Sequence, residues 1–440
     1  MTTVVDPEMP PEAAPAKPQV APLVFQEIQK LPLRELIRLN EEAGLRIRTD
    51  CTRRHLVLDL ARHTLQAGSL VTGTGLLERT QDTWNLRWPA YDLRPGPDDV
   101  LVPSALVKKL ALQPGVMLEV KVRLPRDREQ GLVVEEIHAV EGIPVADWKA
   151  PVEFEKLTPL FPNRRVFLET PVDPEVGARA VDLLSPIGMG QRGLIAAPPR
   201  AGKTILLQTL ARNIRINHPK AALMLLLVDE RPEEVTDMRR ALDCEIYAST
   251  FDEPVQRHIQ ICETVALRAQ RLVELGRDVI ILLDSITRMA RAYNNLQPSK
   301  GGRTMSGGVD AKALARPRKF FGSARNTEEG GSLTILGTAL IETHSRMDDL
   351  IFEEFKGTGN MEIHLDRSIA EMRVFPAIQI VKTGTRREEL LLHPDEYERI
   401  VTLRRQLAEL PAAEAMELLV SNLQHTKSNA ELLLTGLRGI

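Results

Sequence analysis

The stretch APPRAGKT, residues 197–204, has the residue types of a loop that binds phosphate. Gly202, Lys203 and Thr204 match the end of the P-loop pattern, in which the lysine contacts the β- and γ-phosphates and the hydroxyl contacts Mg²⁺. The loop lies between an apolar run, RGLIA, and a helical pattern, KTILLQTLARNI, so its backbone N–H groups are expected at a helix N-terminus. This context favours a nucleoside-triphosphate site over a chance occurrence of GKT.

Ala197 stands where the common P-loop pattern has its first glycine. Alanine is compatible with this position only if the backbone there does not take a positive φ. The two prolines that follow favour such a backbone, because they hold the loop open. We therefore expect a phosphate-binding loop despite the missing glycine.

Two further apolar runs end in acidic residues. VIILLDS ends at Asp284, as a Walker B strand does, and an acid at that edge of a sheet can hold Mg²⁺ through water. Its alternative role is to cap the next turn. LLLVDE ends at Glu230, which we expect next to the strand of the phosphate loop, where it can polarise the attacking water. The alternative is a solvated charge run, since Glu233 and Glu234 follow.

Three loop-like segments add cationic residues. GTRREEL places Arg386 and Arg387 together, and an arginine that stabilises transition-state charge is often supplied by a neighbouring subunit. Lys300 and Arg303 lie in PSKGGRTMSGGVD, and Arg346 lies in ETHSRMDD. These three can contact a phosphate backbone. Solvated surface charge is the alternative for all five.

The chain must supply a sheet to position these residues. From Arg165 onward, apolar strands and helical patterns alternate, which predicts an α/β fold with a parallel sheet covered by helices on both faces. Before it, short alternating runs broken by turns predict a small β-barrel. The expected boundaries are a disordered segment at 1–29, a helical subdomain at 30–68, the barrel at 69–142, a linker at 143–164 and the ATPase domain at 165–440.

The bulk composition excludes several classes of protein. The formal net charge of the 440 residues is −3, so any nucleic-acid site must be a local patch. The three cysteines form no CxxC pair and their number is odd, which argues against a disulfide framework and for a reducing cytoplasm. The longest apolar run, residues 221–228, is too short to span a bilayer, and the N-terminus has no signal-peptide pattern, so no membrane partner is expected.

Nearly all residues after about 30 resemble the bacterial transcription termination factor Rho family, whose members are hexameric RNA-dependent ATPases. The most specific segments are SPIGMGQRGLIAAPPRAGKT, LLVDERPEEVTDM, STFDEP, DVIILLDSITRMARAYN and EEFKGTGNMEIHL. Members of the family also have alanine at the first position of the phosphate loop, where Ala197 stands here. The resemblance implies a RecA-like ATPase core preceded by a small helical subdomain and an OB-type β-barrel.

The resemblance assigns roles in an ATP and Mg²⁺ site between subunits. It makes Glu230 the catalytic glutamate with Arg231 beside it, Arg386 the arginine finger given to a neighbour, and Arg373 an interface arginine. Asp284 and Thr204 become the metal residues. The residues implied to bind ATP are Arg200, Ala201, Gly202, Lys203, Thr204, Ile205 and Phe375, the last packing on adenine.

The resemblance also implies two RNA sites. Residues 298–310 and 342–346 correspond to the channel loops that grip RNA, with Arg303 and Arg346 where lysines are usual. In the barrel, the family carries a GFGFLR-type stretch whose phenylalanines stack on bases, and the corresponding text here is TWNLRW. Trp84 takes the first aromatic position and Leu86, which has no π-face, takes the second. The neighbouring side chains that can compensate are Arg87 and Trp88.

These observations predict a homohexamer that moves along single-stranded RNA and pulls it from RNA polymerase, with transcription elongation factors as further partners. One alternative is a rotary-type ATPase subunit, which also joins a barrel to a RecA-like core. The other is a non-catalytic RNA-binding regulator that keeps only the fold. The intact lysine, threonine, aspartate and glutamate positions speak against the regulator.

Overall fold

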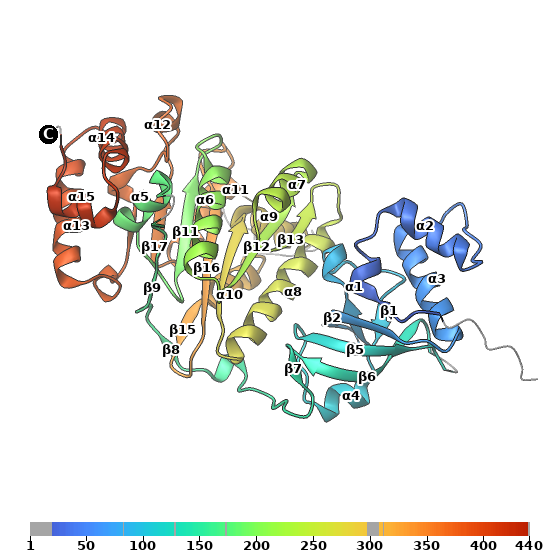
Figure 1. Cartoon of the computed structure of the whole chain (residues 1–440). Coiled ribbons are helices and arrows are strands. Elements are labelled where there is room, and N and C mark those ends of the chain that lie inside the picture. Colours follow the sequence, from blue (N-terminus) through green and yellow to red (C-terminus); the bar gives the residue numbers. More distant parts are fainter. Residues whose placement is uncertain are drawn as a thin grey trace, which may run out of the picture. The chain divides into compact units, whose positions relative to one another are not determined.

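The computed structural model describes residues 20–438 except 82, 127–128, 172–173, 297–307 and 311. The chain forms two compact units, each with its own contacts (Figure 1). The first contains the described residues through Ala111 together with Met117–Trp148. The second contains Leu112–Val116 and the described residues from Lys149 onward. Among the described residues, no helix combines the length and apolarity that crossing a membrane requires.

The first unit begins with a helical layer. The apolar positions expected at helical spacing do form two helices, α2 and α3, and Leu36 and Leu56 are buried in them. Residues 20–29, expected to be disordered, instead form a short strand and a turn of helix, because Phe25 is fully buried against Trp88. The elements are β1 (Leu23–Val24), α1 (Phe25–Ile28), α2 (Leu33–Glu42) and α3 (Arg53–Gln66).

The rest of the first unit is a closed barrel of five strands. It closes because β2 pairs with β3 on one side and with β5 on the other, which confirms the barrel expected from the sequence. β1 and β7 extend the sheet at β2 and β6. The elements are β2 (Val71–Thr80), β3 (Thr83–Arg87), η1 (Pro89–Tyr91), β4 (Val100–Leu101), α4 (Ser104–Lys109), β5 (Met117–Arg123), β6 (Leu132–Val140) and β7 (Ile143–Pro144).

The second unit is built on a mostly parallel sheet in the order β13-β12-β14-β16-β11-β17-β18. The first six strands run parallel, so their carboxyl ends meet at one edge, where ligands bind in such sheets. β18 is antiparallel to β17. The strands are β11 (Arg192–Ala197), β12 (Ala222–Glu230), β13 (Glu245–Thr250), β14 (Asp278–Asp284), β16 (Ser332–Leu340), β17 (Met361–His364) and β18 (Gly384–Thr385).

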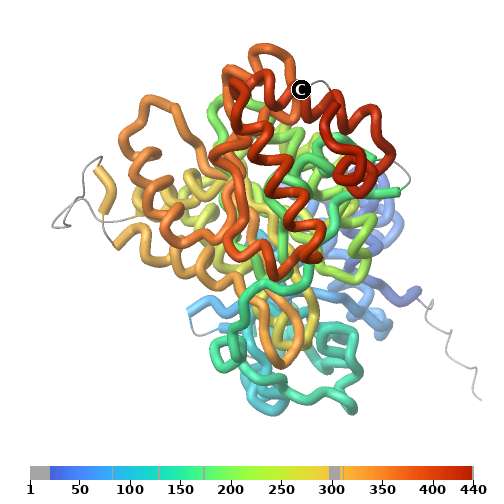
Figure 2. The backbone as a smooth tube through the Cα atoms, turned by 90° about the vertical axis from the view of Figure 1, so that its left-hand side faces the viewer, coloured from blue at the N-terminus to red at the C-terminus, as the bar shows by residue number. Residues whose placement is uncertain are grey.

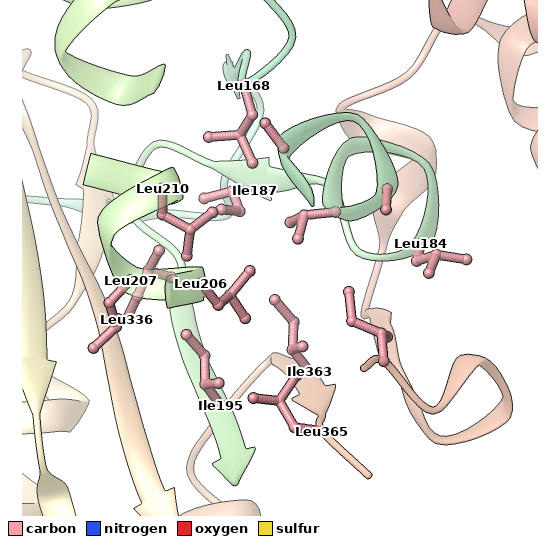
Figure 3. Close-up of a cluster of buried hydrophobic side chains, with 14 of the residues drawn as sticks. Leu168, Leu184, Ile187, Ile195, Leu206, Leu207, Leu210, Leu336, Ile363 and Leu365 are labelled. Atoms are coloured by element: carbon pink, nitrogen blue, oxygen red, sulfur yellow. The ribbon is translucent and has the colours of Figure 1, made fainter. Parts of the chain in front are cut away.

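Helices cover both faces of this sheet, as the apolar strands predict. Alternate residues of a strand point to opposite faces, so Leu223, Leu225 and Leu227 of β12 share one core with α5, α6 and α7. Figure 3 shows another part of this core, in which Leu206 of α6 lies by Ile195 of β11 and Ile363 of β17. The helices α8, α9 and α11 pack on the other face. The helices are α5 (Val176–Leu184), α6 (Lys203–Asn217), α7 (Pro232–Ala241), α8 (Val255–Glu274), α9 (Ile286–Asn295), α10 (Ala315–Gly322), α11 (Arg346–Lys356) and α12 (Arg367–Glu371).

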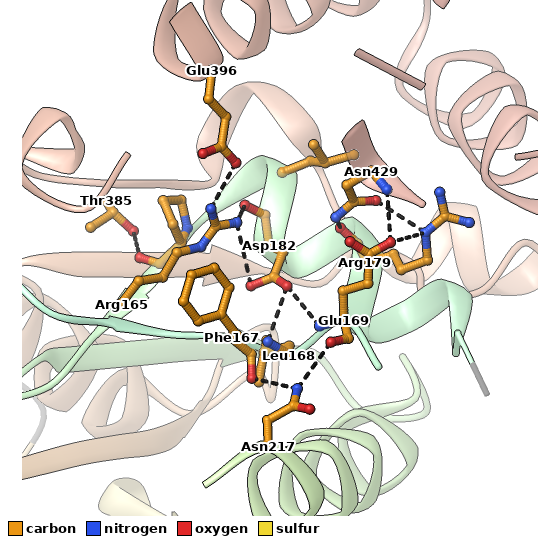
Figure 4. Close-up of polar contacts among 12 residues, drawn as sticks. Arg165, Phe167, Leu168, Glu169, Arg179, Asp182, Asn217, Thr385, Glu396 and Asn429 are labelled. Carbon is orange, nitrogen blue, oxygen red and sulfur yellow. Dashed lines mark hydrogen bonds and ion pairs between the residues drawn. The ribbon is translucent and has the colours of Figure 1, made fainter. Parts of the chain in front are cut away.

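Three C-terminal helices, α13 (Pro394–Ala408), α14 (Ala412–Gln424) and α15 (Asn429–Thr435), gather against α5 (Figures 1 and 2). Buried charges fix them there (Figure 4). Arg165 bonds Glu396 of α13 at 2.7 Å, and Arg179 of α5 donates to Asn429 of α15 at 3.1 Å. Burial raises the pKa of Asp182, which lies beside Arg165, to about 6.

The stretch expected to be a linker is structured in part. Its first residues form β7 of the barrel, and Pro159–Leu160 form β8, which pairs with β15 at the margin of the core sheet. Phe154 is buried, and its N–H donates to the Glu274 carboxylate of α8 at 2.6 Å. The remaining short elements are η2 (Phe154–Lys156), β9 (Arg165–Val166), β10 (Ile187–Gly188), β15 (Arg325–Thr327), η3 (Ile380–Lys382) and η4 (Glu388–Leu390).

Candidate nucleotide and RNA sites

The phosphate loop joins the carboxyl end of β11 to the N-terminus of α6. Ala197 is the last strand residue, so its backbone is extended and needs no glycine. Arg200 (φ 65°) and Gly202 (φ 87°) take left-handed conformations and turn the chain into the helix. Lys203 and Thr204 are the first two helical residues. The strand, loop and helix that a phosphate site requires are therefore present.

Lys203 and Asp284 meet at this edge of the sheet. The Lys203 ammonium lies 2.6 Å from Asp284 Oδ1, and the carboxylate also accepts the Thr338 hydroxyl at 2.8 Å. Asp284 is 2% exposed, as expected for the last residue of a buried strand. The Thr204 hydroxyl has no hydrogen-bond partner among the described residues. Two hard oxygen groups and a cation thus face the place where phosphates bind.

Glu230 is buried at the end of β12 with one oxygen unpartnered. Its Oε2 atom lies 3.2 Å from Arg288 Nε but has no hydrogen-bond partner among the described residues. Burial raises the pKa of Glu230 to about 8, and the neighbouring Glu234 and Asp284 add to this rise. A buried carboxyl with a raised pKa, paired with one arginine at the ligand-binding edge of the sheet, is typical of a functional site.

The expected position of β12 in the sheet was wrong. β12 does not lie beside β11, because β14 and β16 pair between them. Glu230 still lies near the same site, since β12 pairs directly with β14 and Leu227 lies opposite Asp284. The Lys203 and Asp284 charges are close enough to shift the pKa of Glu230, in opposite directions. The parallel arrangement brings strand ends together even when the strands are not neighbours.

The sequence analysis did not identify a cluster of polar side chains next to Glu230, formed by Asp229, Arg288 and His258. Asp229 takes a left-handed backbone (φ 56°), and Arg288 of α9 donates to both its carbonyl and its carboxylate. Buried His258 lies 3.9 Å from the Asp229 carboxylate and 2.9 Å from the Ser249 hydroxyl. Arg288 follows Asp284 by four residues, in the first turn of the helix after the strand, and that spacing is the only sequence signal of its role.

A pocket of about 270 Å³ adjoins the phosphate loop. The Phe375 ring forms one wall and lies so close to Gly202 that a Cβ there would be 3.3 Å from it. Ile205 lines the pocket and is otherwise 60% exposed. The other lining residues are Glu175, Val176, Gly177, Ala201, Leu206, Thr209, Leu365, Pro376 and Ala377. A flat apolar group the size of a nucleobase suits these walls.

The expected catalytic arginines lie in different places. Arg231, the N-cap of α7, directly follows Glu230 and its side chain is 65% exposed. Arg373 is exposed and follows α12, which comes after the carboxyl end of β17. Arg386 lies instead at the amino end of β17, where its N–H donates to the Asn360 carbonyl at 2.9 Å. Arg386 is therefore at the sheet edge opposite the phosphate loop of its own chain.

The second loop expected to contact RNA follows β16 at the nucleotide edge. Arg346 begins α11, is exposed, and has no ion pair among the described residues. Asp348, two residues on, is fully buried between Arg291 of α9 (2.9 and 2.5 Å) and the Thr343 hydroxyl (2.6 Å). Helix α9 thus contacts both Glu230 and this loop. Lys300 and Arg303 lie outside the described residues.

In the barrel, only the first of the expected base-binding residues is accessible. Trp84 is half-buried, with the Arg79 guanidinium 5.5 Å from its ring centre. Leu86 and Trp88 are fully buried, and the Trp88 ring stacks on Phe25. The remaining candidate, Arg87, is 5% exposed and pairs with the Glu78 and Asp99 carboxylates.

These placements do not fit the base sandwich expected of Arg87 and Trp88. Trp88 also donates its indole N–H to the Asp98 carbonyl at 2.9 Å, so its polar atom is satisfied inside the barrel. Side chains alternate along a strand, and Leu86 and Trp88 therefore share the inward face. Both residues belong to the barrel core, whereas Arg87, on the alternate face, is buried by its ion pairs with Glu78 and Asp99.

Two family models match the two units. Residues 65–146 match the model described as Rho termination factor, RNA-binding domain. Residues 177–384 match the ATP synthase alpha/beta family, nucleotide-binding domain. The barrel is thus of an RNA-binding type, and the core is a nucleotide-binding ATPase domain.

Full-length relatives decide the family. The chain is 48% identical over 428 residues to transcription termination factor Rho of Akkermansia muciniphila, covering 97% of this chain and 89% of the relative. It is 49% identical to Rho of Aquifex aeolicus, covering 93% and 94%. The chain belongs to the Rho family of transcription termination factors. Rho of Pseudomonas aeruginosa is also similar, at 47% identity with 92% and 97% covered.

Solved structures support the RecA-like fold of the Rho-family core. An ATPase of a bacterial type III secretion system has a TM-score of 0.54 at 22% identity, covering 63% of this chain and 85% of that one. The assembled ATPase EscN has a TM-score of 0.53 at 18% identity, with 82% and 98% covered. These two structures, at 22% and 18% identity, show only the fold, whereas the RNA-binding barrel and the full-length relatives belong to the Rho family. The rotary and non-catalytic alternatives are not favoured.

Proposed function

We propose that this Rho-family protein is an RNA-dependent ATPase that translocates along single-stranded RNA as a homohexamer. The observation that carries the proposal is Glu230: a carboxyl buried at a strand end, paired with Arg288 and near a lysine and an aspartate, on a chain that also has an RNA-binding barrel. A buried carboxyl with a raised pKa beside a phosphate-loop lysine is typical of a catalytic site.

The nucleotide would be held by the phosphate loop. The Lys203 ammonium, which contacts Asp284 without nucleotide, would exchange that contact for the β- and γ-phosphates. The pocket walled by Phe375 and Ile205 suits adenine. The Thr204 hydroxyl and the Asp284 carboxylate are hard oxygen donors of the kind Mg²⁺ prefers. Bound there, the ion would neutralise charge that develops on the phosphates.

Hydrolysis would need two groups around the γ-phosphate. The Glu230 carboxylate, held by Arg288, would orient the attacking water and accept its proton once the carboxyl is ionised. Arg386 lies at the far edge of the sheet, so it would serve the nucleotide of a neighbouring protomer and neutralise transition-state charge there. Arg231 and Arg373, both exposed near the nucleotide edge, would contact the same interface.

RNA would be bound at two places. The barrel would capture the strand, with Trp84 offering a stacking face for one base. Arg346 would contact the RNA backbone in the ring. Because α9 touches Glu230 through Arg288 and the Arg346 loop through Arg291, one helix can transmit nucleotide state to the RNA loop. Lys300 and Arg303 are proposed to join this inner site on sequence grounds.

The proposed purpose of this movement is to pull nascent RNA from RNA polymerase, with elongation factors as further partners. The test is ATP hydrolysis by the full-length protein, alone and with poly(C), poly(U) and poly(A). We expect hydrolysis to be low alone and strongly stimulated by at least one polymer. Full-speed hydrolysis without RNA, or by isolated monomers in sedimentation, would overturn the proposal.

A further inference from the structure

The segment that carries Arg386 is anchored on several sides, while the exposed Arg386 side chain lies near only the charge of Glu362 on β17. The Thr385 hydroxyl donates to the Pro186 carbonyl at 2.8 Å, and the Arg386 N–H donates to Asn360. Just beyond, Glu388 forms a two-pronged ion pair with Arg404 of α13, with both contacts at 2.8 Å. Arg386 itself is exposed, with no side-chain hydrogen bond or ion pair among the described residues.

The fourth anchor is a cation–π contact from a residue far away in sequence. The Arg387 guanidinium lies 4.5 Å from the centre of the Phe161 ring. Arg387 takes a left-handed backbone (φ 59°), and its guanidinium also lies 3.6 Å from the Glu389 carboxylate. Phe161 is 60% exposed, so burial in the core does not explain why its ring lies beside Arg387. The two residues and Arg386 line one pocket of about 240 Å³, together with Asn360 and Arg192.

Gly188 explains why Phe161 can approach this segment. A Cβ on Gly188 would be 2.6 Å from Pro162 and 2.8 Å from Leu391, closer than real contacts allow. Because Gly188 has no side chain, Pro162, which follows β8, and Leu391, which follows η4, can both pack against its backbone. This brings Phe161, next to Pro162, over Arg387.

We propose that Phe161 and Arg387 are positioning residues for Arg386, holding the turn so that Arg386 points outward to the neighbouring protomer's nucleotide. The inference rests on the proposed function, in which Arg386 acts in trans. The stack does not touch ATP. Its contribution is a preorganised turn, so that an exposed arginine need not be ordered at each turnover.

The test replaces the aromatic face and leaves the charge in place. Phe161→Leu removes the ring, and we expect kcat for RNA-stimulated hydrolysis to fall about two- to fivefold with KM for ATP unchanged. Phe161→Tyr keeps a ring and should restore the rate. Phe167→Leu is the matched control, because Phe167 is 54% exposed and stacks under Arg165 at 5.1 Å, away from Arg386.

The double variant Phe161→Leu/Arg386→Ala distinguishes an effect of Phe161 on the position of Arg386 from an effect on the stability of the protein. In the Arg386→Ala background, Phe161→Leu should cause no further loss of hydrolysis, because the finger through which it acts is gone. An equal rate for Phe161→Leu and Phe167→Leu, with Arg386→Ala inactive, would overturn the positioning role alone. Full activity of Arg386→Ala would overturn the proposed role of Arg386 and this inference with it.

Discussion

The edge of the ATPase sheet and strand β3 of the barrel both bury charged or polar side chains, but they leave them in opposite conditions. At the sheet edge, Glu230 has an oxygen without a hydrogen bond, and Arg346 is exposed without an ion pair. At the end of β3, Arg87 is held by two carboxylates, and the indole N–H of Trp88, the next residue, is bonded to a carbonyl. Both regions contain residue types that sequence reasoning assigns to function.

The difference teaches that the completeness of a polar side chain's hydrogen bonds and ion pairs separates residues that act on a ligand from residues that stabilise the fold. A polar group whose bonds are complete stabilises its own domain, whereas an incomplete one is available to a ligand. By this criterion, Trp88 and Arg87 stabilise the barrel and Trp84 is its accessible aromatic residue on β3. The same criterion marks the Thr204 hydroxyl and the exposed Arg386 for chemistry, while Lys203 and Glu230 are marked by their place at the phosphate loop.

The strongest way to break the comparison is Lys203→Ala. Loss of the ammonium should reduce RNA-stimulated ATP hydrolysis by at least about a hundredfold, because its charge acts where phosphate charge develops. RNA binding by the barrel should remain at its normal affinity. Phosphate release and RNA filter binding measure the two properties, and Lys220→Ala, an exposed lysine in the turn after α6, is the control. Parallel loss of RNA binding would show that the two units are not functionally separate.

The pH profile sharpens the assignment of Glu230. Because burial raises its pKa to about 8, the carboxyl is mostly neutral at pH 6 and cannot accept a proton from water. Only the ionised form is active, so kcat/KM should rise as pH rises. The fraction ionised grows about fiftyfold between pH 6 and pH 8 for such a pKa. Steady-state kinetics across that range measures it, and a flat profile would contradict the role of Glu230 as base.

The two tryptophans of the barrel should behave differently. Trp84→Ala removes a stacking face and should weaken RNA binding about tenfold, with the melting temperature unchanged. Trp88→Ala leaves a cavity beside Phe25 and should destabilise the first unit by about 3–5 kcal/mol. RNA titrations and thermal unfolding distinguish them. The comparison fails if Trp84→Ala melts early or if a folded Trp88→Ala protein loses RNA affinity alone.

The smallest effect is expected for Arg346→Ala. An exposed arginine contributes up to about 1 kcal/mol to a contact, so RNA stimulation of hydrolysis should fall up to about fivefold. Hydrolysis without RNA should be unchanged. Arg405→Ala, an exposed arginine of α13, is the control for loss of surface charge. Equal rates for the two variants would remove Arg346 from the RNA site.

The sequence predicted the elements whose signal is local. GKT after an apolar run predicted the loop and helix, and apolar runs ending in Asp284 and Glu230 predicted the strand ends of the site. The order of the strands was not predictable in this way, because pairing depends on contacts between distant segments. Arg288, Thr338 and Phe161 were missed for the same reason, since each meets its partner only through the tertiary fold.

The barrel illustrates the same limit from the other side. Alternation groups Trp84, Leu86 and Trp88 on one face of β3, but it does not say which face is covered. That depends on Phe25, from a segment expected to be disordered. The family resemblance suggested that Trp88 binds a base, but its stacking on Phe25 buries the ring and leaves no face for a base.

In the proposed assembly, Arg386, on the far side of the sheet from Lys203, serves a neighbour's nucleotide, so each chain would supply only part of every catalytic centre it takes part in. Dilution below the assembly threshold would therefore silence the protein abruptly. An inactive subunit incorporated into a mixed oligomer would also inactivate the sites that it shares with normal subunits. Inactive alleles of this protein should therefore be dominant.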